Sequence, residues 1–201
     1  MSENKSIIAI CLAAFVAVSP AIGFAQATTF SGQAVAVRAN AVGIALSLSD
    51  TGPLPAGGGN LKTSLASVNV LGLVTADVLS SATSGSGASS QSTSSAADVN
   101  LLGGLVAADV VKSNSNATCS GGQAAVTGNS ELVGLVVAGQ PVVNLNPNVA
   151  LSLPGGISVI VNEQTSSPSG NTGAITVNAL HVTGPSVDIV VASAHSDITC
   201  S

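Results

Sequence analysis

Along most of the chain, apolar and polar residues alternate, and short clusters of Gly, Ser and Pro separate the alternating stretches. Alternation with a period of two is typical of a β-strand that buries one of its faces. Three such stretches, 157–164, 174–182 and 187–195, follow one another with short connections rich in turn residues. This arrangement predicts a three-stranded meander.

The stretch VNLLGGLVAADVV at 99–111 is almost wholly apolar, and VNVLGLVTADVL at 68–79 closely resembles it. Either copy is too short to cross a bilayer as a helix. A helix at 99–111 would also contain Gly103, Gly104 and several β-branched residues, all of which disfavour helical structure. Two strand segments joined at the glycines are therefore predicted. Strict alternation would place Val106, Ala108 and Val110 on one face, and Leu105, Ala107, Asp109 and Val111 on the other.

The rest of the chain follows the same pattern. Strands are predicted within 31–50, 61–72, 73–84, 89–104, 105–118 and 131–143, with a turn-rich loop at 51–60. We expect an all-β fold, an antiparallel two-layer sandwich of about 8–10 strands, with a β-roll or solenoid-like arrangement as the alternative. Small residues on the strand faces imply closely spaced sheets. The Ser-rich segment 80–96 fits a strand with a polar face, a flexible linker or an O-glycosylated stretch.

The first 27 residues have the features of a secretory signal peptide. Lys5 precedes the apolar run 7–18, and the small residues of a cleavage site end at Ala27. We therefore predict a signal-peptide helix at 1–27, followed by a single all-β domain at 28–201. The mature protein is expected to have no stable membrane insertion after the signal is removed.

Charged and aromatic residues are scarce, which limits the classes of partner. The chain contains 4 Lys and Arg residues and 9 Asp and Glu residues, for a formal net charge of −5. So few bases cannot neutralise a run of phosphates, so we expect no nucleic-acid binding and no electrostatic docking to anionic lipid. Phe30 is the one aromatic residue after the predicted leader. This argues against a carbohydrate-binding module that stacks sugar rings on Trp or Tyr.

The cysteines predict one disulfide. Cys11 lies in the predicted leader and follows Ile10, where a lipoprotein signal needs a small residue, so no lipid anchor is expected. Cys119 and Cys200 remain as a pair, and we predict a bond between them, with free thiols or an intermolecular bridge as the alternatives. The bond would close a loop of about 80 residues, worth roughly 4 kcal/mol in the chain-entropy model.

Five segments carry a family resemblance over roughly 30–200. They are SDTGPLPAGGGN (49–60), the Ser-rich 81–96 ahead of LLGGLVAADVV, LPGGISVIVNEQ (153–164), VNALHV (177–182) and DIVVASAHSDITC (188–200). In this order they resemble the choice-of-anchor P family of bacterial exported proteins. The resemblance implies a surface-associated domain whose relatives carry different C-terminal anchors or sorting signals, and it implies no enzymatic activity. This sequence shows no hydrophobic tail, basic stop or sorting motif, so we expect release or non-covalent association.

The two histidines are the first candidates for chemistry. Strict alternation would place His181 on one face with Ile175, Val177 and Ala179, and His195 in line with Val187, Ile189 and Val191. Glu163 ends a neighbouring predicted strand, so it can form a pair with a histidine. Hydrolysis would also need a nucleophile and an oxyanion site, and no G-x-S-x-G or S-x-x-K motif in a serine-enzyme context is present. We expect no catalytic residue and no enzymatic activity.

Two further groups of polar residues are candidates for binding. Asp77 and Asp109 occupy matching positions in the two similar stretches, and Asp98 lies in a third AADV. Calcium needs several oxygen ligands at one point, and no local D-x-D-x-D-G run supplies them, so protection of sheet edges is the favoured role. No metal or cofactor is therefore expected.

The tripeptide NEQ at 162–164 ends an apolar strand. Glu163, Gln164 and His181 form a weak candidate polar site for a ligand or partner. The favoured role is structural, with the amides of Asn162 and Gln164 satisfying loop backbone groups. The loop 51–60 is a further candidate for binding.

These observations favour an exported, non-enzymatic structural or adhesive protein, secreted or non-covalently associated with a bacterial cell surface. Long, weakly charged strands suit packing with copies of itself or with other surface components. The alternative is a secreted ligand-binding module that uses flat Thr, Ser and Ala faces against a polysaccharide or ice. Scarce aromatic residues weigh against the polysaccharide, and the lack of a regular T-x-T array weighs against ice.

Overall fold

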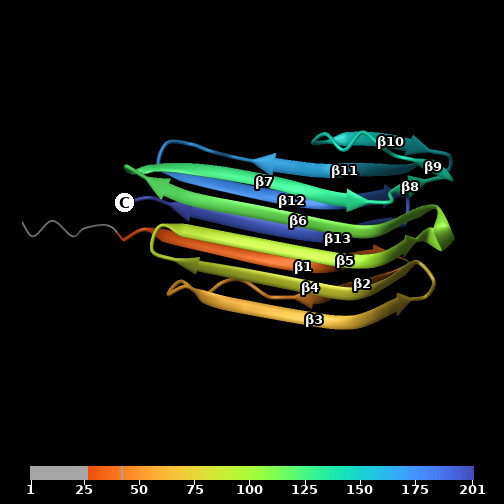
Figure 1. Ribbon diagram of the computed structural model, residues 1–201, viewed down its shortest axis with the longest axis horizontal. Coiled ribbons are helices and arrows are strands. Elements are labelled where there is room, and N and C mark those ends of the chain that lie inside the picture. Colours follow the sequence, from red (N-terminus) through yellow and green to blue (C-terminus); the bar gives the residue numbers. More distant parts are fainter. Residues whose placement is uncertain (1–26, 42) are drawn as a thin grey trace, which may run out of the picture.

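The computed structural model describes residues 27–41 and 43–201, which form two antiparallel β-sheets packed face to face as a sandwich (Figure 1). The predicted all-β sandwich is confirmed, and the alternative solenoid does not form. The predicted signal peptide, 1–27, lies outside the described residues except for Ala27.

Sheet A combines the N-terminal and C-terminal strands in the spatial order β10-β11-β12-β13-β1-β2. Its strands are β1 (Thr29–Ala41), β2 (Ile44–Asp50), β10 (Val149–Leu153), β11 (Ile157–Ser166), β12 (Thr172–Gly184) and β13 (Val187–Thr199).

Sheet B contains the middle of the chain in the order β3-β4-β5-β6, after which β6 pairs with β7 along most of its length and with β8 at its start. Its strands are β3 (Gly59–Val70), β4 (Val74–Ser86), β5 (Ser89–Leu101), β6 (Val106–Ser120), β7 (Gln123–Val133), β8 (Val136–Val137) and β9 (Gln140–Pro141).

The segment 99–111 contains two strand pieces joined at the glycines, as predicted. The end of β5 and the start of β6 flank a short 3-10 turn, η1 (Leu102–Gly104), in which Gly103 and Gly104 have φ of 67° and 94°. Such angles cost glycine little. Within the described residues no helix is long and apolar enough to cross a membrane. The meander predicted near the C-terminus is confirmed as β11, β12 and β13.

Two predictions about the strands were wrong. The segment 131–143 is not one strand, because Gly134 and Gly139, both with positive φ, divide it among the end of β7, β8 and β9. The predicted strands also omitted most of β7 and all of β10. The Ser-rich segment 80–96 belongs to β4 and β5, and its serines lie on both faces of sheet B.

Several strands change the face that they turn to the core halfway along their length. In four of them a residue near the change has a left-handed φ: Val78 (49°), Asp98 (48°), Asn162 (52°) and Ala192 (54°). A left-handed residue interrupts the pleat, so the following residues turn their opposite face inward. β6 changes face without a left-handed residue of its own, and the faces predicted for 105–111 were wrong: Val106 and Ala108 are buried before the change, and Val111 rather than Val110 is buried after it.

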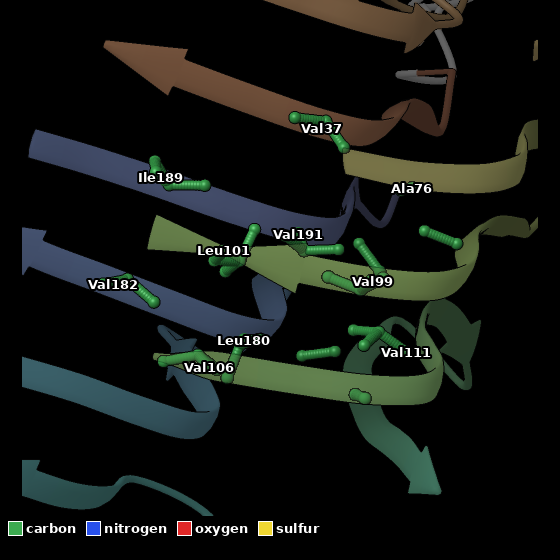
Figure 2. Packing of buried hydrophobic residues seen from close by; sticks show 14 of the residues in the cluster. Val37, Ala76, Val99, Leu101, Val106, Val111, Leu180, Val182, Ile189 and Val191 are labelled. Carbon is green, nitrogen blue, oxygen red and sulfur yellow. The ribbon is translucent and has the colours of Figure 1, made fainter. Parts of the chain in front are cut away.

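The change of face divides the interior into two halves with different chemistry. The first half is apolar: Leu101 and Val106 of sheet B pack in one cluster with Leu180, Ile189 and other residues of sheet A (Figure 2). Burial of such side chains contributes about 1.5–3 kcal/mol each, so this cluster supplies most of the apolar stabilisation.

The second half is lined by hydroxyl groups. Its buried polar residues include Ser81, Thr83, Ser90, Ser92, Ser94, Ser113, Ser115 and Ser196, each at most 1% exposed. Hydrogen bonds cross between the sheets here: Ser92 Oγ donates to the carbonyl of His195 at 2.7 Å, and the hydroxyls of Ser115 and Ser196 lie 2.9 Å apart. A Cβ atom built on Gly32 would lie 2.5 Å from Thr83 Oγ1, so the sheets approach closely.

The disulfide between Cys119 and Cys200 is confirmed. It joins the end of β6 in sheet B to the residue that follows β13 in sheet A, with 5.6 Å between the Cα atoms. The bond therefore closes the hydroxyl-lined end of the sandwich.

Candidate functional site

The structure places both histidines on the outer, solvent-facing side of sheet A. Strict alternation had placed His181 with Ile175, Val177 and Ala179, but those three are buried and His181 is not. Ala179 and Leu180 are buried in succession, which shifts the phase of β12 before His181 is reached. The same shift in β13 turns His195 outward. The prediction for both side chains was therefore wrong.

His181 lies between two carboxylates. Its Nδ1 is 3.0 Å from Glu163 Oε2 and its Nε2 is 3.1 Å from Asp188 Oδ1, while Asn178 Nδ2 donates to the same Glu163 oxygen at 2.6 Å. Only an imidazole protonated on both nitrogens donates to both carboxylates at once. The network spans β11, β12 and β13, so it links three neighbouring strands of sheet A.

Gln164, predicted as part of the same site, belongs to a separate cluster. Its side-chain amide donates to Asn162 Oδ1 at 2.8 Å, and its backbone N–H donates to Asn148 Oδ1 at 2.8 Å. Asn162 Nδ2 in turn donates to the carbonyl of Leu145 at 3.0 Å. These bonds fasten the segment before β10 to β11, which is the structural role favoured from the sequence for Asn162. The structure thus joins Glu163 with His181 and leaves Gln164 apart.

His195 lies between a hydroxyl and a carboxylate, a combination that the sequence pattern did not predict. Thr176 Oγ1 is 2.9 Å from His195 Nδ1, and His195 Nε2 is 3.1 Å from Asp197 Oδ2. Thr176 and His195 are directly paired across β12 and β13, and Asp197 follows two residues later on the same face. A hydroxyl, an imidazole and a carboxylate in a chain are the components of a triad, but a triad also needs donors for an oxyanion.

The aspartates considered for calcium lie on three adjacent strands, because Asp77 pairs with Ala97, next to Asp98, and Ala97 pairs with Val110, next to Asp109. No group of three or more His, Cys, Asp or Glu side chains suited to a metal ion occurs in residues 27–41 and 43–201. Asp109 packs instead against the turn after β7, where a Cβ atom on Gly134 would lie 2.2 Å from its carboxylate.

The outer face of sheet B has a different character, which the sequence analysis did not locate. Where β3 to β7 run side by side, the register aligns outward side chains in rows across five strands. One row is Asn60, Ser84, Gln91, Asn116 and Thr127, and the next is Lys62, Ala82, Thr93, Asn114 and Asn129. We call these two rows the amide–hydroxyl face.

Two adjoining depressions cross the amide–hydroxyl face. One runs from the turn before β3 to β6, the other from β5 to β7, and they share Gln91 and Asn116. The side chains of Gln91, Asn116, Thr127 and Asn129 form none of the hydrogen bonds found among the described residues. Alternation of Asn and Ser in KSNSNAT at 112–118 was the sequence signal for this face, because its Asn residues point outward and its serines inward.

The free edges of sheet B are long and nearly uncharged. β3 has 12 residues with Lys62 as its one charged side chain, and β7 has 11 residues with Glu131 as its one charged side chain. Neither contains Pro, and strands of about 5–6 residues are usual. Exposed edges are normally protected by charge, Pro or short length. One outward backbone group on each edge is already bonded: the carbonyl of Thr63 in β3 accepts from Ser49 Oγ at 3.0 Å, and the N–H of Ala124 in β7 donates to the carbonyl of Gly170 at 3.0 Å.

Comparison with known proteins identifies no relative. No family model matches the chain, and no curated protein or solved structure matches it either. The resemblance to the choice-of-anchor P family therefore stays a prediction.

Proposed function

We propose that the protein is an exported, non-enzymatic structural protein of the cell surface that associates with copies of itself through the free edges of sheet B. The observation that carries this proposal is the pair of long edge strands, β3 and β7, which have one charged residue each and no Pro. Their unpaired backbone groups form a template for another strand.

The geometry of sheet B suits lateral addition of one copy to the next. Four antiparallel steps separate β3 from β7, so both strands run in the same direction, with Asn60 level with Thr127. A copy added in this register would bring its β3 beside β7 of its neighbour. Lys62 would then lie two residues before the position level with Glu131, on the same face of the sheet. The opposite charges would favour that register. A head-to-tail contact of this kind leaves one edge free on each terminal copy, so further copies can add to either end.

Export is supported by two features. The predicted leader at 1–27 has the order of elements found in secretory signals, and the Cys119–Cys200 disulfide is typical of proteins that fold in an oxidising compartment.

The non-enzymatic part of the proposal is supported by the surroundings of the two histidines. His181 is held between two carboxylates, and His195 contacts a threonine hydroxyl on an open sheet face. Thr176 and His195 lie on inner strands and are paired with a neighbouring strand on each side, so the sheet ladder uses the backbone N–H groups next to them rather than presenting them to an oxyanion.

The test is the native mass of the protein in the medium, a surface wash and the cell fraction of its host, with and without reductant. We expect detergent-resistant material of high mass in the surface wash. Recovery of the protein from the medium as a free monomer with its disulfide intact would contradict the proposal.

Charge reversal at the edges identifies the contact. Lys62→Glu should shift purified protein toward monomer, and the double variant Lys62→Glu/Glu131→Lys should restore the high-mass form. The matched control is Asn40→Lys, which adds a charge to an exposed position on the inner strand β1. Equal loss of assembly in this control would mean that the edges of sheet B do not form the contact.

A further inference from the structure

The two outer faces of the sandwich use their polar groups in opposite ways. On sheet A several charged and polar side chains are bonded to one another: His181 to Glu163 and Asp188, and Gln33 to Asp50. On the amide–hydroxyl face of sheet B, the row from Asn60 to Thr127 contains no charged residue, and the next row contains Lys62 alone, at the sheet edge.

The groups of the amide–hydroxyl face are also free to bind. Gln91, Thr127 and Asn129 are exposed, and their side chains form no hydrogen bond within the described residues. Beside them, Thr93 Oγ1 donates to Asn114 Oδ1 at 3.0 Å, which fixes two neighbouring side chains in place. An array of this kind presents donors and acceptors at intervals of about 4.8 Å across the strands.

We propose that the amide–hydroxyl face binds an uncharged polysaccharide, with the chain lying across the strands in the two depressions that meet at Gln91 and Asn116. Hydroxyl groups of a neutral sugar chain both donate and accept, as do amides and threonine hydroxyls, so each can satisfy the other. The trough from β3 to β7 crosses four strand spacings, roughly 19 Å, which accommodates several sugar units.

Charge and composition select this occupant over others. A polyanion would find one cation, Lys62, at the edge of the two rows, and a cationic partner would find no carboxylate in them. The face contains no aromatic ring, so binding does not use stacking and depends on many weak hydrogen bonds. We therefore expect weak binding at one site and firm retention on an insoluble polysaccharide, where assembled copies bind many sites.

The experiment is depletion of the full, oxidised protein from solution by microcrystalline cellulose, chitin and insoluble β-1,3-glucan, with pectate gel as the anionic control. We expect depletion by at least one of the three neutral polysaccharides and none by pectate. The double variant Gln91→Ala/Asn129→Ala, at two exposed positions, should bind about tenfold more weakly. The matched control is Asn40→Ala/Ser47→Ala on the outer face of sheet A, which should bind as the unmodified protein does.

The outcomes separate this inference from the proposed assembly. Failure of all three neutral polysaccharides to bind, or equal binding by the Gln91/Asn129 variant, would overturn the inference. Inhibition of ice recrystallisation without retention on any polysaccharide would overturn it too and identify ice as the occupant. Glu131 lies at the β7 edge and outside the two rows of the face, so retention of the Glu131→Lys monomer on polysaccharide would support the binding face even if the edges do not assemble.

Discussion

The side-chain oxygens of Ser115 in β6 and Ser196 in β13 lie 2.9 Å apart in the interior, and neither residue is more than 1% exposed. The two residues are 81 positions apart in the chain and belong to different sheets. Ser196 Oγ also donates a hydrogen bond to the backbone carbonyl of Ser115, over 3.3 Å. Because its own proton is used in that bond, the Ser196 oxygen is free to accept the proton of the Ser115 hydroxyl. In this half of the sandwich, hydrogen bonds between the sheets act together with the apolar contacts of buried residues such as Val177 and Ile198.

The Ser115–Ser196 pair predicts unequal effects of two similar substitutions. Ser196→Ala leaves the buried Ser115 hydroxyl without a partner, which should lower the free energy of unfolding by about 1–2 kcal/mol. Ser115→Ala leaves Ser196 still bonded to a carbonyl and should cost less. The double variant should cost less than the sum of the two, because both hydroxyls are gone. Urea denaturation of the oxidised proteins measures all three values, and strict additivity would contradict the predicted coupling.

The Cys119–Cys200 bond predicts a large dependence of stability on oxidation. Loss of a cross-link between residues 81 positions apart should destabilise the fold by roughly 4 kcal/mol, because the unfolded chain gains freedom. Urea midpoints with and without reductant give the value, and Cys119→Ala/Cys200→Ala serves as the control that reductant cannot affect. Equal midpoints for the oxidised and reduced protein would show that the bond contributes little.

Alternation along the chain was sufficient to predict the sandwich, the C-terminal meander and the strand–turn–strand at 99–111. It was not sufficient to predict which face of a strand is buried, since one left-handed residue reverses the phase. Nothing in the identities of Val78 and Ala192 marks them for that conformation, because β-branched and alanine side chains normally avoid it. The short β8 and β9 were also missed, since Gly134 and Gly139 divide an apolar run that looked continuous.

Val78 provides a test of the left-handed position in β4. Its side chain is 66% exposed and its φ is 49°, a conformation that costs a residue with a Cβ atom about 1–2 kcal/mol. Asn tolerates this region better, so Val78→Asn should raise the free energy of unfolding by about 0.5–1 kcal/mol. Val133→Asn is the matched control, because Val133 is 45% exposed in a strand without a left-handed φ at that position. A gain in the control as large as in Val78→Asn would contradict the explanation by backbone strain.

The candidate sites were predictable only in part. The sequence placed Glu163 where it can pair with a histidine, but the choice of His181 and the contribution of Asp188 depend on a register that the sequence does not reveal. The amide–hydroxyl face depends on alignment across five strands, and four of its members, Gln91, Asn116, Thr127 and Asn129, come from three separate strands. Each strand alone contains only ordinary polar residues.

Gly128 lies where the two sheets approach each other closely beside β7. A Cβ atom there would lie 2.4 Å from Val177 Cγ2 and 2.8 Å from Ile175 Cδ1, both in sheet A. Gly128→Ala should therefore destabilise the fold by about 1–3 kcal/mol through overpacking. Gly57→Ala is the matched control, since a Cβ on Gly57 meets nothing within 4 Å. Combining Gly128→Ala with Val177→Ala should recover part of the loss, and a strictly additive double variant would argue against direct contact.

Thr176, His195 and Asp197 allow a direct test of whether the outer face of sheet A is catalytic. The three side chains form a hydroxyl–imidazole–carboxylate chain, but they lie on inner strands whose backbone N–H groups pair within the sheet. Without spare donors for an oxyanion, an acyl-transfer intermediate would gain no stabilisation there. We therefore expect hydrolysis of small activated esters at the rate seen with Thr176→Ala and His195→Ala, measured by release of the chromogenic alcohol. Turnover above that of both variants would show that Thr176, His195 and Asp197 form a nucleophilic site and would refute the non-enzymatic proposal.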